Sequence, residues 1–237
     1  MESRKVAVIT GASQGIGAGL VRAYLDLGYA VVANSRSIAP STEDGLVTVA
    51  GDISDPEVAE RVIATATSTF GRVDALVNNA GVFIAKPFTD YTHEDFDTAL
   101  RVNLGGFFHV TQRAVADMLT RGSGHIVNIT TTLVENADAN VPSALASLTK
   151  GGTASVVKSL AIEYASRGIR VNAVSPGIIK TPMHAAETHD TYAALHPMRS
   201  MGTIDDIVHG VMYLEQAPFV TGEFLHVDGG QSAGNGR

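Results

Sequence analysis

The chain has 237 residues, which is enough for one complete α/β domain with its own hydrophobic core. Apolar residues make up 45% and charged residues 17%, a composition typical of folded globular proteins and not of disordered ones. The net charge of −7, without any basic run, argues against nucleic acid as a partner. The absence of cysteine excludes disulfides, thiolate catalysis and cysteine-based zinc sites.

The chain begins with a short polar segment that leads into an apolar run ending at Thr10. This run is too short for a signal peptide or a membrane span. We therefore expect a cytoplasmic protein that has no membrane partner.

Short apolar, β-branched runs alternate along the chain with longer stretches of helical periodicity. The runs predicted as strands are Lys5–Thr10, Ala30–Asn34, Leu46–Ala50, Ala75–Asn78, His125–Ile129, Arg170–Val174 and Phe224–Val227. The stretches predicted as helices are Ile16–Leu27, Pro56–Thr69, His93–Leu119, Ser143–Ser166 and Ile204–Leu214. This alternation predicts a single doubly wound α/β domain over residues 1–237, with a parallel sheet of about seven strands and helices on both faces.

Helix boundaries are marked by residues with specific backbone roles. Asp55 followed by Pro56 is typical of a cap and a first helical turn. Gly28, Gly71 and Gly168 each follow a helical stretch, where glycine commonly ends a helix in the left-handed conformation.

Two connections depart from the regular alternation. Ser35–Gly45 is a short polar segment, so the helix that such folds often place there is expected to be reduced or absent. Residues 180–201 contain several histidines and prolines and little periodicity. We interpret them as a mobile flap over the substrate site.

A glycine-rich turn follows the first predicted strand. Gly11, Gly15 and Gly17 lie between this strand and the next helix, where they would allow the backbone to approach a pyrophosphate at the helix N-terminus. Their spacing differs from the usual Gly-x-Gly-x-x-Gly fingerprint. A tight strand–helix turn without a ligand is the alternative interpretation.

Further motifs follow in an order and spacing that resemble the short-chain dehydrogenase/reductase family over nearly the whole chain. They are Thr10–Gly17, Asp52, Asn78-Asn79-Ala80-Gly81, Asn103, Ile126–Thr131, Lys150, Asn172, Pro176-Gly177, Thr181 and Asp228-Gly229-Gly230. The resemblance implies a Rossmann-type fold, a nicotinamide cofactor, and hydride transfer to or from a small alcohol or carbonyl compound.

The resemblance also implies which residues bind the cofactor. Asp52 would accept a hydrogen bond from the adenine amino group, with a turn cap as the alternative role, and the loop from Pro176 to Thr181 would hold the nicotinamide carboxamide. The full expected set is Gly11, Ser13, Gln14, Gly15, Ile16, Gly17, Ser35, Arg36, Asp52, Ile53, Asn79, Ala80, Gly81, Lys150, Pro176, Gly177, Ile179 and Thr181.

The end of the second predicted strand indicates which cofactor is preferred. An acidic residue there would bind the ribose hydroxyls of NAD, but the run ends in Asn34, Ser35 and Arg36 and contains no carboxylate. An arginine guanidinium is suited to a 2′-phosphate. We therefore predict NADP as cofactor, with NAD as the alternative; a solvated arginine remains the other interpretation of Arg36.

The catalytic residues implied by the resemblance are Asn103, Thr131 and Lys150. In the family, a serine orients the carbonyl group and a tyrosine transfers the proton. A lysine lowers the tyrosine pKa and binds the nicotinamide ribose, and an asparagine holds a water that continues the relay. Thr131 occupies the serine position and still offers a hydroxyl. The interval from Thr131 to position 146 is longer than usual, so Thr132 is an alternative.

The tyrosine position of the family is occupied by Ala146. Alanine cannot donate a proton, and general acid–base assistance is worth roughly 10²–10⁴-fold in rate, or about 3–5 kcal/mol of barrier. Three interpretations therefore stay open. Another group supplies the proton, the substrate needs little acid help (as a conjugated or iminium acceptor would), or the protein is a non-catalytic cofactor sensor or regulator.

Candidate substitutes for the tyrosine lie in the flap and around the vacant position. They are His184, His189, Tyr192, His196, and a water held near Ser143 or Ser147. The flap residues match no familiar metal-ligand spacing, so we expect no metal. The small residues of Ser143–Ser166 allow close helix approach, and related proteins commonly pair this helix across a two-fold axis, so we expect a homo-oligomer, a tetramer or a dimer. The sequence does not identify the substrate.

Overall fold

The computed structural model describes residues 4–234, so both ends of the predicted domain, 1–3 and 235–237, lie outside the described residues. The described residues form a seven-stranded sheet with the order β3-β2-β1-β4-β5-β6-β7, and every neighbouring pair is parallel. The strands are β1 (Val6–Thr10), β2 (Ala30–Ser35), β3 (Leu46–Ala50), β4 (Ala75–Asn78), β5 (Gly124–Ile129), β6 (Ile169–Pro176) and β7 (Phe224–Val227). The predicted fold class is confirmed.

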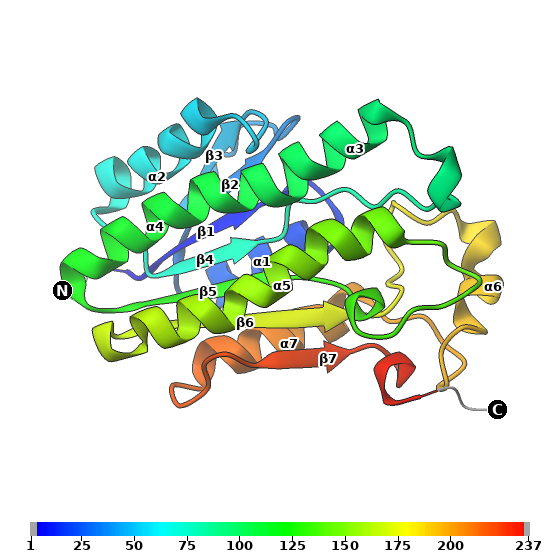
Figure 1. Ribbon diagram of the computed structural model, residues 1–237. Helices are drawn as coiled ribbons and strands as arrows, with labels where there is room; N and C mark the ends of the chain where they lie inside the picture. The colour runs from blue at the N-terminus through cyan, green and yellow to red at the C-terminus, as the bar shows by residue number, and fades with distance from the viewer. Residues whose placement is uncertain (1–3, 235–237) are drawn as a thin grey trace.

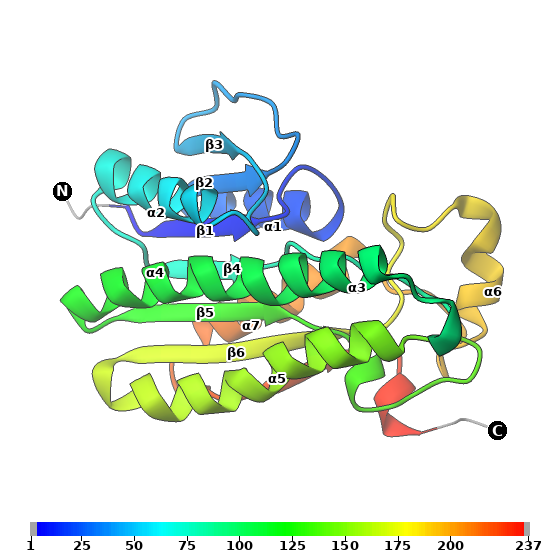
Figure 2. The ribbon, with the colours of Figure 1, turned by 45° about the horizontal axis from the view of Figure 1, so that its top comes forward.

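Helices cover both faces of the sheet (Figures 1 and 2). One face is covered by α1 (Gly15–Asp26) and α7 (Ile204–Gln216), and the other by α2 (Pro56–Phe70), α4 (Phe107–Arg121) and α5 (Ala144–Tyr164). Each face has its own cluster of buried apolar side chains, because strands covered on both sides must be apolar on both sides.

The helix boundaries follow the local signals in the sequence. The Asp55 carboxylate accepts a hydrogen bond from the Glu57 N–H and begins α2. Gly28, Gly71 and Gly168 adopt φ values of 86°, 85° and 78°, a region that only glycine enters without strain. No helix forms between Ser35 and Gly45, as expected.

The long helix predicted over His93–Leu119 is in fact three segments. The helix α3 (His93–Ala99) leads into a π-helical segment, Leu100–Gly106, and then into α4. Periodicity alone could not reveal this segment, since it inserts one residue into an otherwise continuous helix. Such insertions are frequent at functional sites, and this one contains Asn103.

The two ends of the predicted flap lie side by side and are joined by backbone hydrogen bonds. The Lys180 N–H donates to the Gly202 carbonyl, and the Gly202 N–H donates to the Ile178 carbonyl. Between these ends the chain is more ordered than its sequence suggested, because it forms a 3₁₀ turn (Ala186–Thr188) and a short helix, α6 (His189–Ala193). The other 3₁₀ turns are Phe88–Asp90, Thr132–Val134, Ala165–Arg167 and Gln231–Ala233.

Within residues 4–234, every helix is too short or too polar to cross a bilayer.

Candidate active site

A cavity of about 490 Å³ opens at the carboxyl ends of the strands. It is bordered by the loops that follow β1, β2, β4, β5 and β6, and by the flap. The strand order reverses between β1 and β4, the position where open parallel sheets bind ligands.

The glycine-rich turn after β1 is packed so closely that side chains are excluded from it. A Cβ at Gly11, where φ is 66°, would lie 2.9 Å from the Ala80 Cα. A Cβ at Gly17 would lie 2.7 Å from the Asn79 Nδ2 and would also collide with the Gly11 carbonyl. Asn79 fixes this arrangement, because its Nδ2 donates to the carbonyls of Thr10 and Gly11. These two glycines are therefore required for the turn to pack against the loop after β4, and the turn borders the cavity on its other side.

Two buried polar atoms at the end of β2 have no hydrogen-bond partner among residues 4–234. They are the Asn34 Oδ1 and the Ser35 Oγ, and both residues border the cavity. Arg36 follows them on the exposed rim, where no described residue accepts a hydrogen bond from its guanidinium. Buried polar groups without partners are rare in native proteins. A polar ligand in this part of the cavity could therefore form hydrogen bonds with both atoms.

Asp52 borders the same end of the cavity but already has protein partners. Its Oδ1 accepts hydrogen bonds from the Ser54 N–H and Oγ, and its Oδ2 accepts one from the Arg101 Nη1 at 2.9 Å. The carboxylate thus caps the turn before α2. The carboxylate oxygens can still accept a further hydrogen bond from a ligand that enters the cavity.

Three consecutive threonines end β5, and their hydroxyls differ in what they contact. Thr130 is buried and donates to the Val174 carbonyl, and Thr132 is buried and donates to the Pro176 carbonyl. Thr131 is half-buried, and its Oγ1 accepts a hydrogen bond from the Leu133 N–H. Because the hydroxyl proton of Thr131 has no acceptor within the described chain, Thr131 is the threonine that can donate to a substrate oxygen.

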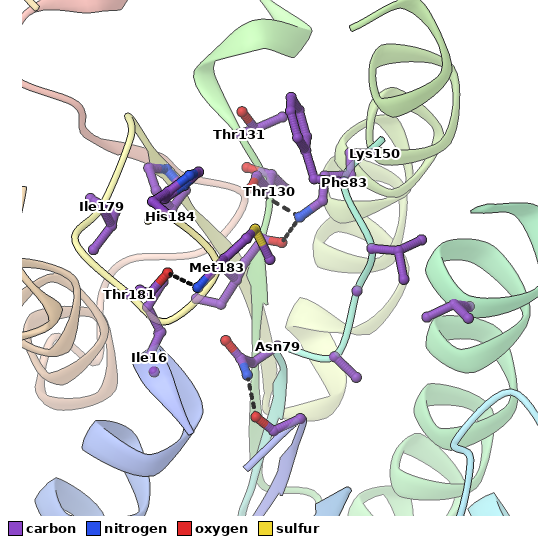
Figure 3. Close-up of a pocket in the computed structure, with 18 of the residues that line it drawn as sticks. Ile16, Asn79, Phe83, Thr130, Thr131, Lys150, Ile179, Thr181, Met183 and His184 are labelled. Atoms are coloured by element: carbon purple, nitrogen blue, oxygen red, sulfur yellow. Dashed lines mark hydrogen bonds between the residues drawn. The ribbon is translucent and has the colours of Figure 1, made fainter. Parts of the chain in front are cut away.

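Lys150 lies across the cavity on α5 and extends toward the end of β5 (Figure 3). Its Nζ donates to the carbonyls of Ile129 and Thr130, each at 3.3 Å. The loss of hydration deep in the protein lowers the pKa of Lys150 to about 8. No carboxylate among the described residues forms an ion pair with it.

Asn103 lies behind Lys150 rather than in the main cavity. Its Oδ1 accepts from the Val82 N–H at 2.8 Å, and its Nδ2 donates to the Thr149 Oγ1 at 3.0 Å. Asn103 and Lys150 both border a second, small cavity of about 20 Å³. Its polar lining comes from Thr10, Asn78, Asn103, Asn128, Lys150 and Thr153. A polar cavity of this size fits one water molecule.

Ala146 does not leave an open hole. The residue is only 2% exposed, and it does not border the main cavity. The adjacent Ser147 Oγ donates to the Leu133 carbonyl, which holds the turn after β5 against α5. Position 146, where the sequence resemblance leads us to expect a tyrosine, is therefore closed over by the protein.

Of the candidate proton donors of the flap, only some lie at the cavity with a group free to donate. His184 and Tyr192 border the cavity, with ring centroids 5.0 Å apart in an edge-to-face contact. His196 is excluded as a donor, because its Nδ1 donates to the Tyr192 carbonyl while its Nε2 accepts from the Ile178 N–H. His196 is 2% exposed and anchors the flap. His189 does not border the cavity.

All but two of the expected site residues border the main cavity: Gly17 lies beneath the glycine-rich turn, and Asn103 lies at the small cavity. Sequence reasoning missed several apolar wall residues and two amides, because isolated residues of these types carry no functional signal. These are Phe83, Val102, Leu133, Asn140, Val141, Pro142, Met183 and Gln231. Within residues 4–234, no three His, Asp or Glu side chains gather in a way that could hold a metal ion.

The comparisons with known proteins agree with this geometry. The family model described as enoyl-(acyl carrier protein) reductase matches residues 11–232. The chain is 35% identical to 3beta-hydroxysteroid dehydrogenase 1 of Eggerthella lenta, over 96% of this chain and 94% of that protein. The chain belongs to the short-chain dehydrogenase/reductase family. The family consists of NAD(P)-dependent oxidoreductases.

Solved structures of the family superpose on nearly the whole chain. ElxO with NADP bound has a TM-score of 0.91 and 31% identity, covering 98% of this chain and all of that one. The 3-ketoacyl-(acyl-carrier-protein) reductase of Brucella melitensis, complexed with NADH, has a TM-score of 0.88 and 33% identity, covering 96% of this chain and 98% of that one. These two relatives bind different nicotinamide cofactors.

Proposed function

We propose that the protein is an NADP(H)-dependent oxidoreductase that interconverts small, uncharged alcohols and carbonyl compounds. The observation that carries this proposal is the combination, around one cavity, of a glycine turn without side chains, a lysine without a counter-ion, and the hydroxyl of Thr131. The first suits a pyrophosphate, and the other two suit a reacting oxygen.

The residues present fit a nicotinamide dinucleotide. The close packing of Gly11 and Gly17 against the loop after β4 keeps the turn tight, and the backbone of Gly11, Gly15 and Ile16 borders the cavity where a pyrophosphate would lie. The unpartnered Ser35 Oγ and Asn34 Oδ1 suit the adenosine ribose. The Arg36 guanidinium beside them supports NADP over NAD, since a 2′-phosphate accepts several N–H donors of an arginine. NAD is the alternative cofactor, and it is supported by the relative whose structure contains NADH.

When bound, the cofactor supplies or accepts a hydride. This chain's own residues then have three tasks. The turn after β1 and the N-terminus of α1 hold the phosphates, Thr131 orients the oxygen of the substrate, and Lys150 places a positive charge near the oxygen that becomes negative during reduction. The apolar wall around Phe83 and Leu133 keeps water away from that oxygen.

The lining of the cavity indicates which substrates are accepted. Arg36 at the adenosine end and Lys150 at the reacting end are the cationic side chains among the described lining residues. The rest of the reacting end is apolar or neutral, with Phe83, Val141 and Met183 among the larger walls. A carboxylate or phosphate on the substrate would lack a partner there, so an uncharged aldehyde, ketone or alcohol is the substrate class we propose.

A panel of uncharged carbonyl compounds tests this function. We expect NADPH oxidation at 340 nm with at least one of 4-nitrobenzaldehyde, decanal, cyclohexanone and benzil. The variant Arg36→Ala is expected to lower kcat/KM for NADPH about tenfold, which corresponds to about 1.4 kcal/mol, without changing the value for NADH. A tenfold preference of the wild type for NADH would contradict the proposed cofactor.

A second function is favoured by one observation, the closed surroundings of Ala146. A protein that binds NADPH tightly but oxidises it with no member of the panel would be a cofactor sensor or regulator. Tight binding with turnover excludes this second function.

The assembly is the last part of the proposal. We propose a single domain over residues 1–237, a cytoplasmic location, and a homo-oligomer, dimer or tetramer, in which α4 and α5 pair with a second copy. Large apolar side chains support this surface, since Phe108 on α4 and Leu148 and Ile162 on α5 are 56%, 59% and 82% exposed. Light scattering at micromolar concentration tests it, and a monomer would contradict it.

A further inference from the structure

Lys150 combines features that a merely structural lysine does not need. Its ammonium lies deep in the protein with no ion pair, and only backbone carbonyls accept its protons. Removing a lysine from water without a counter-ion lowers stability. A side chain that costs stability in this way is expected at a functional site.

The hydrogen bonds of Lys150 leave part of its ammonium available. An ammonium has three N–H groups, and the carbonyls of Ile129 and Thr130 accept from two of them. Lys150 also borders both the main cavity and the small polar cavity. The third N–H is therefore available to a group that enters from either side.

The residue at position 146 determines whether another proton-bearing side chain stands beside the Lys150 ammonium. Residues 146 and 150 are one helical turn apart on α5, so their side chains lie on the same face. A tyrosine at 146 would stand on that face and take the proton-transfer role. Because alanine is too short to reach beyond its own turn, the ammonium of Lys150 is the remaining proton-bearing group of α5 at the cavity.

We propose that Lys150 is the acid of the reaction and donates its own proton to the oxygen of the carbonyl group being reduced. This inference rests on the proposed function, in which the cofactor supplies the hydride to the carbonyl carbon. One N–H bond of the ammonium breaks, one O–H bond of the alcohol product forms, and the lysine becomes a neutral amine. The oxidation of an alcohol runs through the same steps in reverse.

The small polar cavity behind Lys150 supplies the next proton. Its volume of about 20 Å³ and its lining by Asn103 and Asn128 suit one water molecule. A water at that place can relay a proton from solvent to the neutral amine before the next turnover: it accepts one proton as it donates another, so it stays neutral. The π-helical segment that contains Asn103 forms one wall of this cavity.

The acidity of Lys150 suits this task, because the best general acid has a pKa near the working pH. Burial lowers the pKa of Lys150 to about 8, and no charged neighbour contributes to the shift. The other ionisable groups that border the main cavity are Arg36, Asp52, His184 and Tyr192. At pH 7 most of the Lys150 side chains therefore still carry the proton.

His184 is the competing donor, and it is less suited to the reaction. Burial, and the nearby His189, lower the pKa of His184 below its ordinary value of 6.5. Its ring is mostly neutral at pH 7 and has no extra proton to give. The test below includes His184→Ala for this reason.

The first measurement uses the cofactor-free protein. The ¹³Cε resonance of Lys150 in ¹³C-lysine-labelled protein, assigned by its loss in Lys150→Met, is followed from pH 6 to 11. We expect a titration near pH 8. A titration near the ordinary lysine value of 10.5 would overturn the inference.

The second measurement is single-turnover oxidation of NADPH by the fastest carbonyl of the panel, at saturating cofactor, between pH 6 and 10. The wild-type rate is expected to be flat below pH 8 and to fall tenfold per pH unit above it. Lys150→Met and Lys150→Arg are expected to lose roughly 10²–10⁴-fold in rate and to lose the inflection. The matched control Lys158→Met, an exposed lysine of the same helix, is expected to keep both.

The outcomes separate this inference from the function on which it rests. A Lys150→Met protein that binds NADPH and loses less than tenfold in rate, or a pH profile lost in His184→Ala instead, would overturn the inference alone. Absence of NADPH oxidation with every member of the panel would overturn the proposed reductase function and this inference with it.

Discussion

The two ends of the sheet contain buried ionisable groups with opposite surroundings. At the amino ends of the strands, the Glu215 carboxylate accepts hydrogen bonds from Tyr29 Oη at 2.7 Å, His125 Nδ1 at 2.7 Å and Tyr24 Oη at 3.1 Å. The Nε2 of His125 in turn accepts from the Asn172 Nδ2. This network is complete. At the carboxyl ends, neither an ion-pair partner for Lys150 nor a hydrogen-bond partner for the Ser35 hydroxyl is present in the described part of the chain.

Structural and functional polar groups in this fold therefore differ in whether their hydrogen bonds are already satisfied within the protein. A satisfied buried network adds specificity and stability, and nothing remains for a ligand to contact. Unsatisfied groups cost stability in the free protein and are satisfied only when a ligand arrives. The cavity and its unpartnered groups therefore place the candidate site at the carboxyl ends of the strands. One unpartnered buried atom, the Arg121 Nε, lies at the amino ends, but it belongs to a side chain whose Nη2 donates to the Val73 carbonyl and to the Asp117 carboxylate.

We expect the strongest loss from a substitution that distorts the glycine turn. In Gly17→Ala the added Cβ would collide with the Gly11 carbonyl and lie 2.9 Å from the Ala12 Cα, so the turn must shift. We expect calorimetry to show roughly a 100-fold loss of NADPH affinity, about 2.7 kcal/mol. Gly105→Ala is the matched control, because a Cβ there has 3.9 Å of clearance; an unchanged affinity in Gly17→Ala would contradict the proposed cradle.

The next effect breaks the complete network at the other end. Glu215→Gln removes the negative charge. It also replaces one carboxylate oxygen, which accepts hydrogen bonds, by an NH₂ group, which faces the donors Tyr24, Tyr29 and His125. We expect a loss of about 2 kcal/mol in the free energy of unfolding, with NADPH affinity unchanged. Chemical denaturation and calorimetry measure the two quantities, and a loss of affinity without a loss of stability would reverse the assignment of the two ends.

The pH dependence of this network follows from the pKa of Glu215. Burial pushes this pKa upward, but the hydrogen bonds from His125, Tyr29 and Tyr24 outweigh burial and lower it below 4.5. A carboxylate with a lowered pKa contributes stability above its unfolded pKa, and this contribution is lost as the pH falls through the folded pKa. Wild type is therefore expected to lose stability below about pH 4.5 more steeply than Glu215→Gln does.

The smallest effect has the opposite sign. Lys150→Met replaces an unpaired, desolvated ammonium by an apolar side chain, so the cofactor-free variant is expected to be about 1 kcal/mol more stable at pH 7. The folded pKa of about 8 lies below the ordinary 10.5, so the unfolded chain binds more protons between these values. Wild-type stability relative to the variant should then rise from pH 8 to 10.5. A variant less stable than wild type at pH 7 would mean that Lys150 is structural.

The fold could be predicted from the sequence because the apolar runs, the helical periodicity and the helix-end residues all indicate the same architecture. Seven apolar runs, helical stretches between them, and glycines such as Gly71 and Gly168 at the helix ends all indicate one parallel sheet. The helix predicted over His93–Leu119 is present, but the prediction missed its π-helical segment, because the insertion leaves the periodicity almost unchanged. It also missed the order within the flap, which comes from tertiary contacts such as those of His196 rather than from local propensity.

The site was only partly predictable, for a physical reason. The glycine turn, Asn103 and Lys150 have recognisable spacing, because backbone geometry restricts where they stand. The walls formed by Phe83 and Met183 have no such restriction and look like any apolar residue in the sequence. Which of the three threonines can donate, and which flap histidine is already bonded, depend on hydrogen bonds between segments far apart in the chain.

All of the proposed chemistry requires the cavity at the carboxyl ends of the strands to bind a nicotinamide dinucleotide. Calorimetric titration of the cofactor-free wild type with NADPH measures this binding. We expect one site per chain with a roughly micromolar dissociation constant and a higher melting temperature of the complex. No heat and no thermal protection with either NADPH or NADH would contradict it.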